Sequence, residues 1–242
     1  GLQVVGSPES LGEVVLLKTL FAIIAEWGTT VERIRVNALG DRESKARFER
    51  ELGNYLKKNA GQLDQTCREM LAKNPCSTYA CSSETCRQIL ADGPRAVNFL
   101  SEKSRAHFRQ VLEHIEGLGL PYELDDLLVG DEREPRIVFA LDLAGSDGTI
   151  LASTGGRFDE YVRRMSNKKE GAGVSASIFF QKKGSVRSHF STPTTTVQPK
   201  VYFVQLGLRA KLRGLNVIDM LRQAQIPVSQ SFDAKSLAPQ LD

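Results

Sequence analysis

Two glycines, an arginine, an aromatic ring and a carboxylate follow one another in the segment STGGRFDEYV, residues 153–162. An apolar run precedes the segment, so these groups arrive where a predicted strand should end. Glycines let a backbone approach a ligand closely, and an arginine oriented by an aspartate binds carboxylate or phosphate with two parallel hydrogen bonds. The segment could therefore face a substrate. Its residue pattern alone favours a simpler interpretation, in which the strand turns into a helix that Asp159 caps.

Four cysteines fall within twenty residues and nowhere else in the chain: Cys67, Cys76, Cys81 and Cys86. Tetrahedral zinc takes four soft ligands that converge on one point. The cysteine spacings match no C-x-x-C knuckle, so a structural zinc site would require the chain to fold back on itself. Zinc is therefore a hypothesis, with buried or incidental thiols as the favoured alternative. We expect no disulfide among them, because disulfides are rare in a reducing compartment.

Two histidines, His107 and His114, lie seven residues apart on one face of a predicted helix. No carboxylate or cysteine stands beside them at the i+4 spacing that would suggest a metal site. We therefore expect both to be ordinary histidines on the helix surface.

The pattern of apolar residues gives a coarse order of elements along the chain. It predicts helices over 7–28, 42–58 and most of 61–117, and strands over 31–39, 120–129, 136–143 and 148–154. We expect the last three strands to be antiparallel, with GSDG as a turn. The stretch 181–199 is rich in serine, threonine and proline and predicts a linker. The strand–helix–strand pattern over 200–232 is typical of a small α/β domain.

The composition sets few limits on function. The net charge of +3, from 32 basic and 29 acidic residues, permits a nucleic-acid partner without arguing for one. No apolar run reaches the roughly 18 residues needed to cross a bilayer, so we expect a cytoplasmic protein without a membrane partner. The chain starts without a methionine inside a predicted strand and stops inside a predicted helix. We expect both ends to be truncated.

Five segments, taken in order, resemble histidyl-tRNA synthetase, a class II aminoacyl-tRNA synthetase, in its bacterial form. They are IRVNALGDRESKARFERELGNYLKK, CREMLAKNP with ACSSETC, FLSEKSRAHFRQVLEHIEGLGLPYEL, GGRFDEYV and VYFVQLGLRAKLRGLNVIDMLRQAQIPV. The fourth is similar to the family's G-G-R-Y-D-x-L loop, which lines its histidine pocket. Several motifs in the family's order are more specific than any single motif.

The resemblance implies an α+β fold. It has a class II antiparallel-sheet core with a helical insertion, followed by part of an α/β anticodon-binding domain. The implied boundaries are 1–60 and 118–182 for the core, 61–117 for the insertion, 183–198 for a linker and 199–242 for the start of the anticodon-binding-like domain.

The resemblance also implies a reaction. Histidine and ATP form histidyl-adenylate, and the histidyl group then passes to the 3′ end of the tRNA. ATP and Mg²⁺ would be the cofactors, tRNA or another RNA the partner, and a homodimer the assembly. The residues that the resemblance assigns to the pocket wall are Gln3, Gly155, Gly156, Arg157, Phe158 and Asp159.

Three parts of the sequence depart from the family pattern. GDEREPRIVF stands where R-G-L-D-Y-Y is expected, and Gln3 stands where the family often has a glutamate that contacts the substrate ammonium. In GVSASIFFQKK, Phe179 replaces a glycine, and Lys182 or Lys183 stands near the position of an ATP-contacting arginine. A lysine cannot make the planar bidentate contact of an arginine.

From these departures we hypothesise that this copy is impaired or inactive in histidine activation. The alternative is a regulatory or RNA-binding paralogue that binds a partner enzyme. An example is the regulatory subunit of ATP phosphoribosyltransferase in histidine biosynthesis.

Overall fold

The computed structural model of the chain describes residues 1–130, 135–145, 148–167, 171–180, 198–199, 201–231 and 236–241. The chain divides into two compact units, Gly1–Phe179 and Phe180–Asp242. The tip of the predicted GSDG turn and nearly all of the predicted linker fall outside the described residues.

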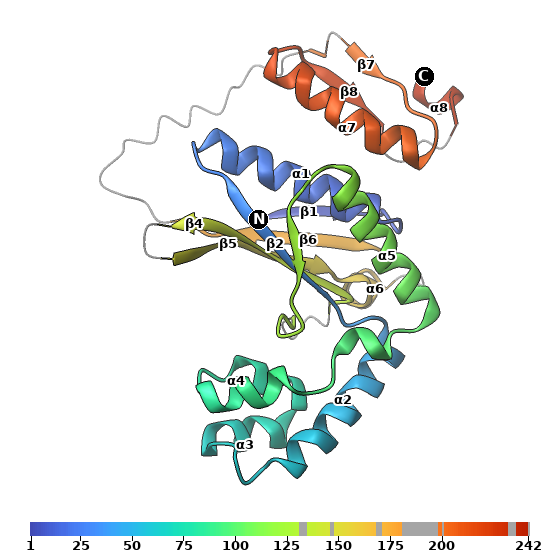
Figure 1. Cartoon of the computed structure of the whole chain (residues 1–242). Coiled ribbons are helices and arrows are strands. Elements are labelled where there is room, and N and C mark those ends of the chain that lie inside the picture. The colour runs from blue at the N-terminus through green and yellow to red at the C-terminus, as the bar shows by residue number, and fades with distance from the viewer. Residues whose placement is uncertain are drawn as a thin grey trace. The chain divides into compact units, whose positions relative to one another are not determined.

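A six-stranded sheet forms the centre of the first unit, with the strand order β1-β6-β5-β4-β2-β3 (Figure 1). Its strands are β1 (Leu2–Val5), β2 (Val31–Ala38), β3 (Tyr122–Leu124), β4 (Ile137–Gly145), β5 (Gly148–Arg157) and β6 (Gly173–Ile178). All neighbours pair antiparallel except β2 and β3, which pair parallel. The predicted α+β class with a mainly antiparallel sheet is confirmed.

The strand predicted over 120–129 differs from the observed one in length and direction. Only β3 forms, and it runs parallel to β2 rather than antiparallel to a neighbour. A parallel pair requires a long crossover connection, and the helices between β2 and β3 supply one. The strand stops at Asp125, whose carboxylate accepts a hydrogen bond of 3.0 Å from the backbone N–H of Leu127 and so forms a turn.

Helices α1 (Leu11–Glu26) and α5 (Glu102–Gly117) lie on one face of the sheet (Figure 1). Side chains that alternate along β2 and β4 point toward these helices, as the period of two in a strand requires. The core that they form includes Leu17, Leu20, Ile24, Ile34, Val36, Val111, Ile115, Ile137, Phe139 and Leu141. Helix α5, which the sequence pattern groups with the helical insertion, therefore packs on the sheet.

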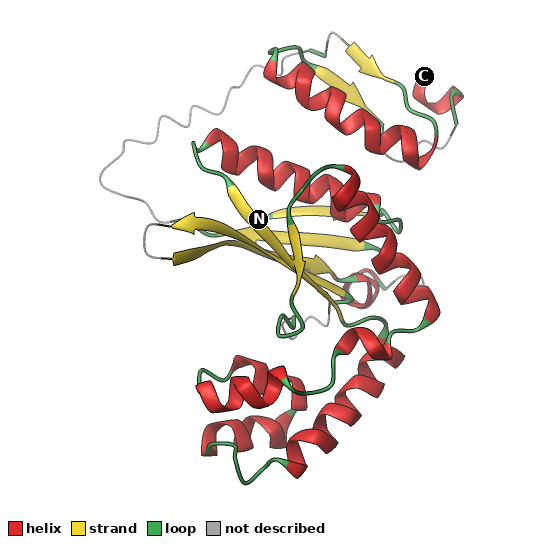
Figure 2. Cartoon of the chain, in the orientation of Figure 1, coloured by secondary structure: helices red, strands yellow, loops and turns green. Residues whose placement is uncertain are grey.

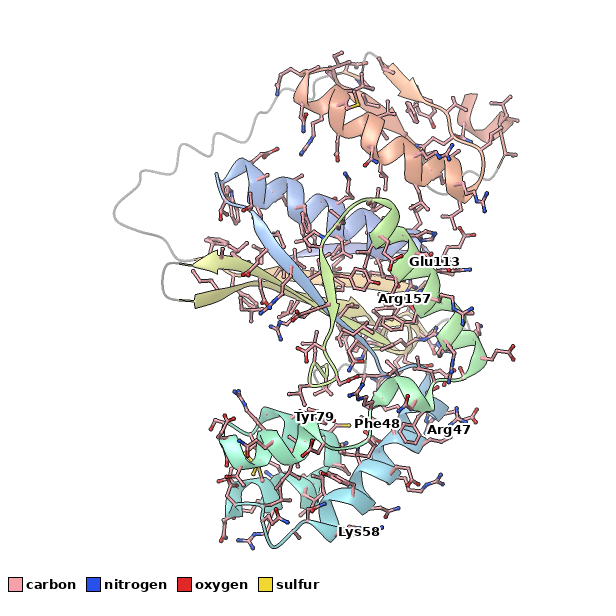
Figure 3. All side chains as sticks on the ribbon, in the orientation of Figure 1. Arg47, Phe48, Lys58, Tyr79, Glu113 and Arg157 are labelled. Carbon is pink, nitrogen blue, oxygen red and sulfur yellow. A yellow bond between two sulfur atoms is a disulfide. The ribbon has the colours of Figure 1, made fainter. Side chains whose placement is uncertain are left out.

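A helical lobe, residues 42–99, carries a second core. It consists of α2 (Arg42–Lys58), α3 (Gln65–Lys73), η1 (Pro75–Ala80), α4 (Glu84–Ala91) and η2 (Ala96–Phe99). Phe48, on α2, and Tyr79, on η1, lie in this lobe (Figure 3). Three of the four cysteines are buried in its core, and Cys67 forms a disulfide with Cys81. The expectation that no disulfide forms is therefore wrong for this pair.

The second unit has a strand–helix–strand arrangement (Figure 2). Strands β7 (Val201–Phe203) and β8 (Val228–Gln230) pair parallel, and α7 (Gly207–Gln223) connects them. A short helix, α8 (Ala238–Leu241), follows. The predicted β-α-β pattern is confirmed. Among the helices of the described residues, none is long and apolar enough to cross a membrane.

Candidate functional site

The segment STGGRFDEYV forms the end of β5 and the start of α6 (Asp159–Ser166). The simpler interpretation, a strand that turns into a helix, is therefore correct in outline. One detail is wrong: the N-cap of α6 is Phe158, which makes no side-chain capping bond, and Asp159 is the first helical residue. The carboxylate of Asp159 instead accepts hydrogen bonds from Arg136, Arg157 and the backbone N–H of Gly173.

The two glycines of the segment are explained by packing within the sheet. A Cβ at Gly155 would lie less than 3.0 Å from the carbonyl oxygen of Ser175 and from the ring of Phe139. A Cβ at Gly156 would meet the carbonyl oxygen of Ile137 in the same way. Both positions require glycine because neighbouring strands approach closely, whether or not a ligand binds.

Arg157 is completely buried, with 0% of its side chain exposed. Its Nε and Nη2 donate to the two carboxylate oxygens of Glu13 on α1, each at 2.6 Å. Its Nη1 donates to Asp159 at 3.1 Å and to the carbonyl oxygen of Ser7 at 3.2 Å, and Nη2 also donates to the carbonyl oxygen of Glu9 at 2.9 Å. A guanidinium has five N–H donors, and these contacts occupy all of them. Arg157 therefore has no donor left for a substrate. It lies inside the first unit (Figure 3).

Glu13 is the residue of this network that the sequence pattern did not single out. It lies on the buried stripe of α1, one helical turn before Leu17, and its side chain is 0% exposed. Burial opposes its ionisation most strongly, but hydrogen bonds and charge from Arg157 and His107 outweigh burial and lower its pKa from 4.5 to about 2. The sequence did contain a signal for Glu13: its carboxylate lies within the apolar stripe of a predicted helix. A carboxylate buried in such a stripe requires a buried partner.

Both histidines of α5 face α1 rather than solvent. His107 Nε2 lies 2.8 Å from Glu13, and His114 Nδ1 lies 3.1 Å from the hydroxyl of Ser10. Both side chains are half-buried. The expectation of surface histidines is therefore wrong. Each histidine of α5 instead contacts the N-terminal part of α1 or the residue before it. Burial lowers the pKa of His114.

A chain of polar contacts continues from Asp159 to α2. Arg136 donates to Asp159 at 2.9 Å and lies 3.5 Å from the hydroxyl of Ser104, which donates to Asp41 at 3.1 Å. Burial opposes ionisation of Asp41, but hydrogen bonds from Ser101, Ser44 and Ser104 lower its pKa. A cavity of about 900 Å³ lies beside this chain, and its lining includes Asp41, His107, Arg136 and Asp159.

The opposite face of the sheet carries different groups. Leu2 and Val4 pack against the core under α1, so Gln3, between them, points to the other face. Gln3 pairs with Ser175, and Ser175 with Gly156. We call the surface formed by Gln3, Thr154, Gly156, Ser175 and Ser177 the open face. None of these five residues carries a charge.

The predicted pocket residues are therefore divided between the two faces of the sheet. Gln3 and Gly156 belong to the open face, whereas Arg157 points to α1. At the β2–β4 end of the open face, Arg35 donates to Asp142 at 2.7 Å and to Asp125 at 2.8 Å. Phe158 is buried, and Phe179 is 51% exposed just after β6. Lys182 and Lys183 lie outside the described residues.

The structure brings three of the four predicted metal ligands close together, beside an aspartate. The carboxylate of Asp64 and the sulfur atoms of Cys67, Cys81 and Cys86 all lie within 4.8 Å of one another. Cys76 is not part of this group. Burial and the nearby charge of Glu49 raise the pKa of its thiol to about 12.

Comparison with known proteins gives a consistent result along the chain. Over its whole length the chain is 27% identical to the histidine–tRNA ligase of Chlorobium phaeobacteroides. Over 74% of its length it is 32% identical to the histidine–tRNA ligase of Rhodospirillum rubrum. It covers 56% of the first of these proteins and 44% of the second. The chain thus spans about half the length of the curated relatives it matches. No family model matches it.

A solved structure shares the fold. The crystal structure of apo S. aureus histidyl-tRNA synthetase matches 99% of this chain with a TM-score of 0.56 and 17% sequence identity. The matched part covers 59% of that chain.

The buried pair gives a prediction on stability. Glu13→Gln should lower the free energy of unfolding by about 3–5 kcal/mol, because it leaves the charge of Arg157 buried without its main partner. Urea unfolding at neutral pH measures this.

Because folding lowers the pKa of Glu13, the carboxylate stabilises the fold above about pH 4.5 and loses that effect as the pH falls toward about 2. The unfolding free energy of Glu13→Gln should therefore depend less on pH in that window.

The matched control is Glu160→Gln, which removes a carboxylate that pairs with Arg163 on the partly exposed surface of α6. It should change the unfolding free energy by less than about 0.5 kcal/mol. Equal effects of the two substitutions would contradict a special role for Glu13.

Proposed function

Because the chain belongs to the histidyl-tRNA synthetase family, we propose that it is a synthetase-like core that is impaired in histidine activation. The family reaction joins histidine to its tRNA with ATP. The observation that carries the proposal is that Gln3 stands where the resemblance expects a carboxylate, among the uncharged residues Thr154, Gly156, Ser175 and Ser177. An amino-acid ammonium group needs an acceptor with negative charge to be held tightly.

The described residues of the open face do not fit ATP with Mg²⁺. Mg²⁺ requires oxygen ligands, usually carboxylates, and a transferring phosphoryl group requires cations. The five residues of the open face supply neither. Asp142 and Asp125, at the far end of this face, are engaged by Arg35. Arg157 is engaged by Glu13 and Asp159.

Histidine-dependent ATP–pyrophosphate exchange tests the proposal. We expect exchange at least roughly 100-fold slower than that of an active histidyl-tRNA synthetase, since the loss of one charge-stabilising group costs about 10²–10³ in rate. The assay should use the natural protein at the length that its gene encodes. Exchange at the rate of an active synthetase would overturn the proposal.

A gain-of-binding variant tests the role of Gln3. Gln3→Glu places a carboxylate on the open face and should tighten histidine binding by roughly tenfold or more, as a charged hydrogen bond is worth about 1.5–3 kcal/mol. The matched control is Gln88→Glu, which makes the same change at an exposed site in the helical lobe and should leave the affinity unchanged. Calorimetry measures both affinities. Tight histidine binding by the unmodified protein, without exchange, would instead favour the regulatory alternative.

RNA binding is the second candidate function, and one observation in the second unit favours it. Arg209 and Arg213 lie one turn apart in the first half of α7, and both are exposed. Basic side chains at this spacing share one helix face and can contact successive phosphates. The positive end of the helix dipole adds to the attraction for phosphate.

Replacing both arginines by alanine should weaken tRNA binding and reduce the slope of log affinity against log salt by about 2, as two phosphate contacts are lost. Filter binding over a salt series measures this. The control is Arg50→Ala with Arg87→Ala, which removes the same charge from exposed sites in the helical lobe. An unchanged salt slope in the α7 variant would remove α7 as the RNA-binding element.

A further inference from the structure

Four potential metal ligands converge in the helical lobe, three of them buried cysteines and the fourth an aspartate at the surface of the lobe. They are the carboxylate of Asp64 and the sulfur atoms of Cys67, Cys81 and Cys86, all within 4.8 Å of one another. We propose that, when its thiols are reduced, this cluster binds one zinc-class cation through one aspartate and three cysteines. A tetrahedral zinc site with Zn–S bonds of about 2.3 Å has ligand–ligand distances of about 3.8 Å. To reach that geometry the ligand atoms that are farthest apart would approach by about 1 Å at most, and the sulfur atoms of Cys67 and Cys81, bonded to each other in the disulfide, would move apart after reduction.

The local sequence is consistent with such a site. Asp64 and Cys67 are separated by two residues, and Cys81 and Cys86 by four. Two ligand pairs of short spacing, separated by a longer segment, are typical of structural zinc sites. The spacing of the cysteines alone does not show this pattern, because one of the four proposed ligands is an aspartate.

Helix ends place the ligands. Asp64 is the N-cap of α3 and accepts a 2.7 Å hydrogen bond from the backbone N–H of Cys67, which lies in the first turn. Cys86 lies in the first turn of α4, and Cys81 follows η1 as its C-cap. The positive ends of two helix dipoles therefore point at the cluster and favour the negative charge of thiolate ligands.

Burial suits a structural site rather than a catalytic one. All three sulfur atoms belong to residues in the hydrophobic core of the lobe, which are at most 4% exposed. A closed set of four protein ligands leaves no open position for a substrate. The ion would join α3, η1 and α4 in a lobe whose own apolar core is small, and small cores gain most from such a cross-link.

Cys76 separates this proposal from a site made of the four cysteines. It is outside the cluster, and its half-buried thiol faces Glu49. A four-cysteine site would need Cys76 as a ligand and would not need Asp64. The observed cluster includes Asp64 and does not include Cys76.

The Cys67–Cys81 disulfide defines the redox condition for binding. A dithiol reductant breaks the S–S bond by donating two electrons and two protons, and is itself oxidised to a disulfide. The resulting thiols, together with Cys86, release three protons to solvent when the cation binds. Binding should therefore require prior reduction.

Cobalt titration of the reduced protein tests the proposal. We expect one Co²⁺ per chain, with visible bands of a tetrahedral site whose charge-transfer intensity fits three thiolates. Zinc should displace the cobalt and raise the melting temperature. Native mass spectrometry should find one bound zinc. Absence of cobalt or zinc binding after reduction would overturn the proposal.

Variants then assign the ligands. Cys86→Ser should weaken cobalt binding by more than the roughly 10–100-fold that loss of an outer-shell partner costs. Cys76→Ser is the matched control and should bind cobalt like the unmodified protein. Asp64→Asn should also weaken binding, and it keeps the helix cap because asparagine caps as well as aspartate, so a folding defect would not explain its effect. Loss of binding in Cys76→Ser, or full binding in Asp64→Asn, would contradict the assignment.

Discussion

Arg157 and Glu13 form a fully buried ion pair in the first unit. It joins the end of β5 to α1, and Arg157 extends it to the backbone of Ser7 and Glu9 in the segment before that helix. Removing one member of a fully buried pair leaves a charge in a low-dielectric interior, which costs several kcal/mol. Glu13 also lies 2.8 Å from His107, so the same polar network joins the end of β5, α1 and α5.

This constraint changes the meaning of the G-G-R-F-D segment. Both glycines are required because neighbouring strands approach closely. The guanidinium of Arg157 is hydrogen-bonded to Glu13. Asp159 accepts hydrogen bonds from Arg136 and Arg157. Each group is therefore explained by contacts within the chain. The segment is therefore accounted for by the fold, and it carries less information about any chemistry that the chain performs.

Much of the fold could be predicted from the sequence because hydrophobic periodicity reports which face of an element is buried. The antiparallel pairing of β4 with β5 and the β7-α7-β8 arrangement follow from such patterns. The parallel pairing of β3 could not be predicted, since it depends on where a long crossover returns the chain. The site was harder to predict. The division of Gln3 and Arg157 between two faces of the sheet, and the position of Asp64 rather than Cys76 beside the other three cysteines, depend on contacts between distant segments that no local pattern encodes.

A double-mutant cycle tests most directly whether the Arg157–Glu13 contact holds the fold. Unfolding free energies are measured for Glu13→Leu, Arg157→Met and the double variant, in which the two apolar side chains face each other. We expect the double variant to be more stable than the sum of the single effects predicts, by about 1–3 kcal/mol. Strictly additive effects, with a coupling energy below about 0.5 kcal/mol, would contradict the account.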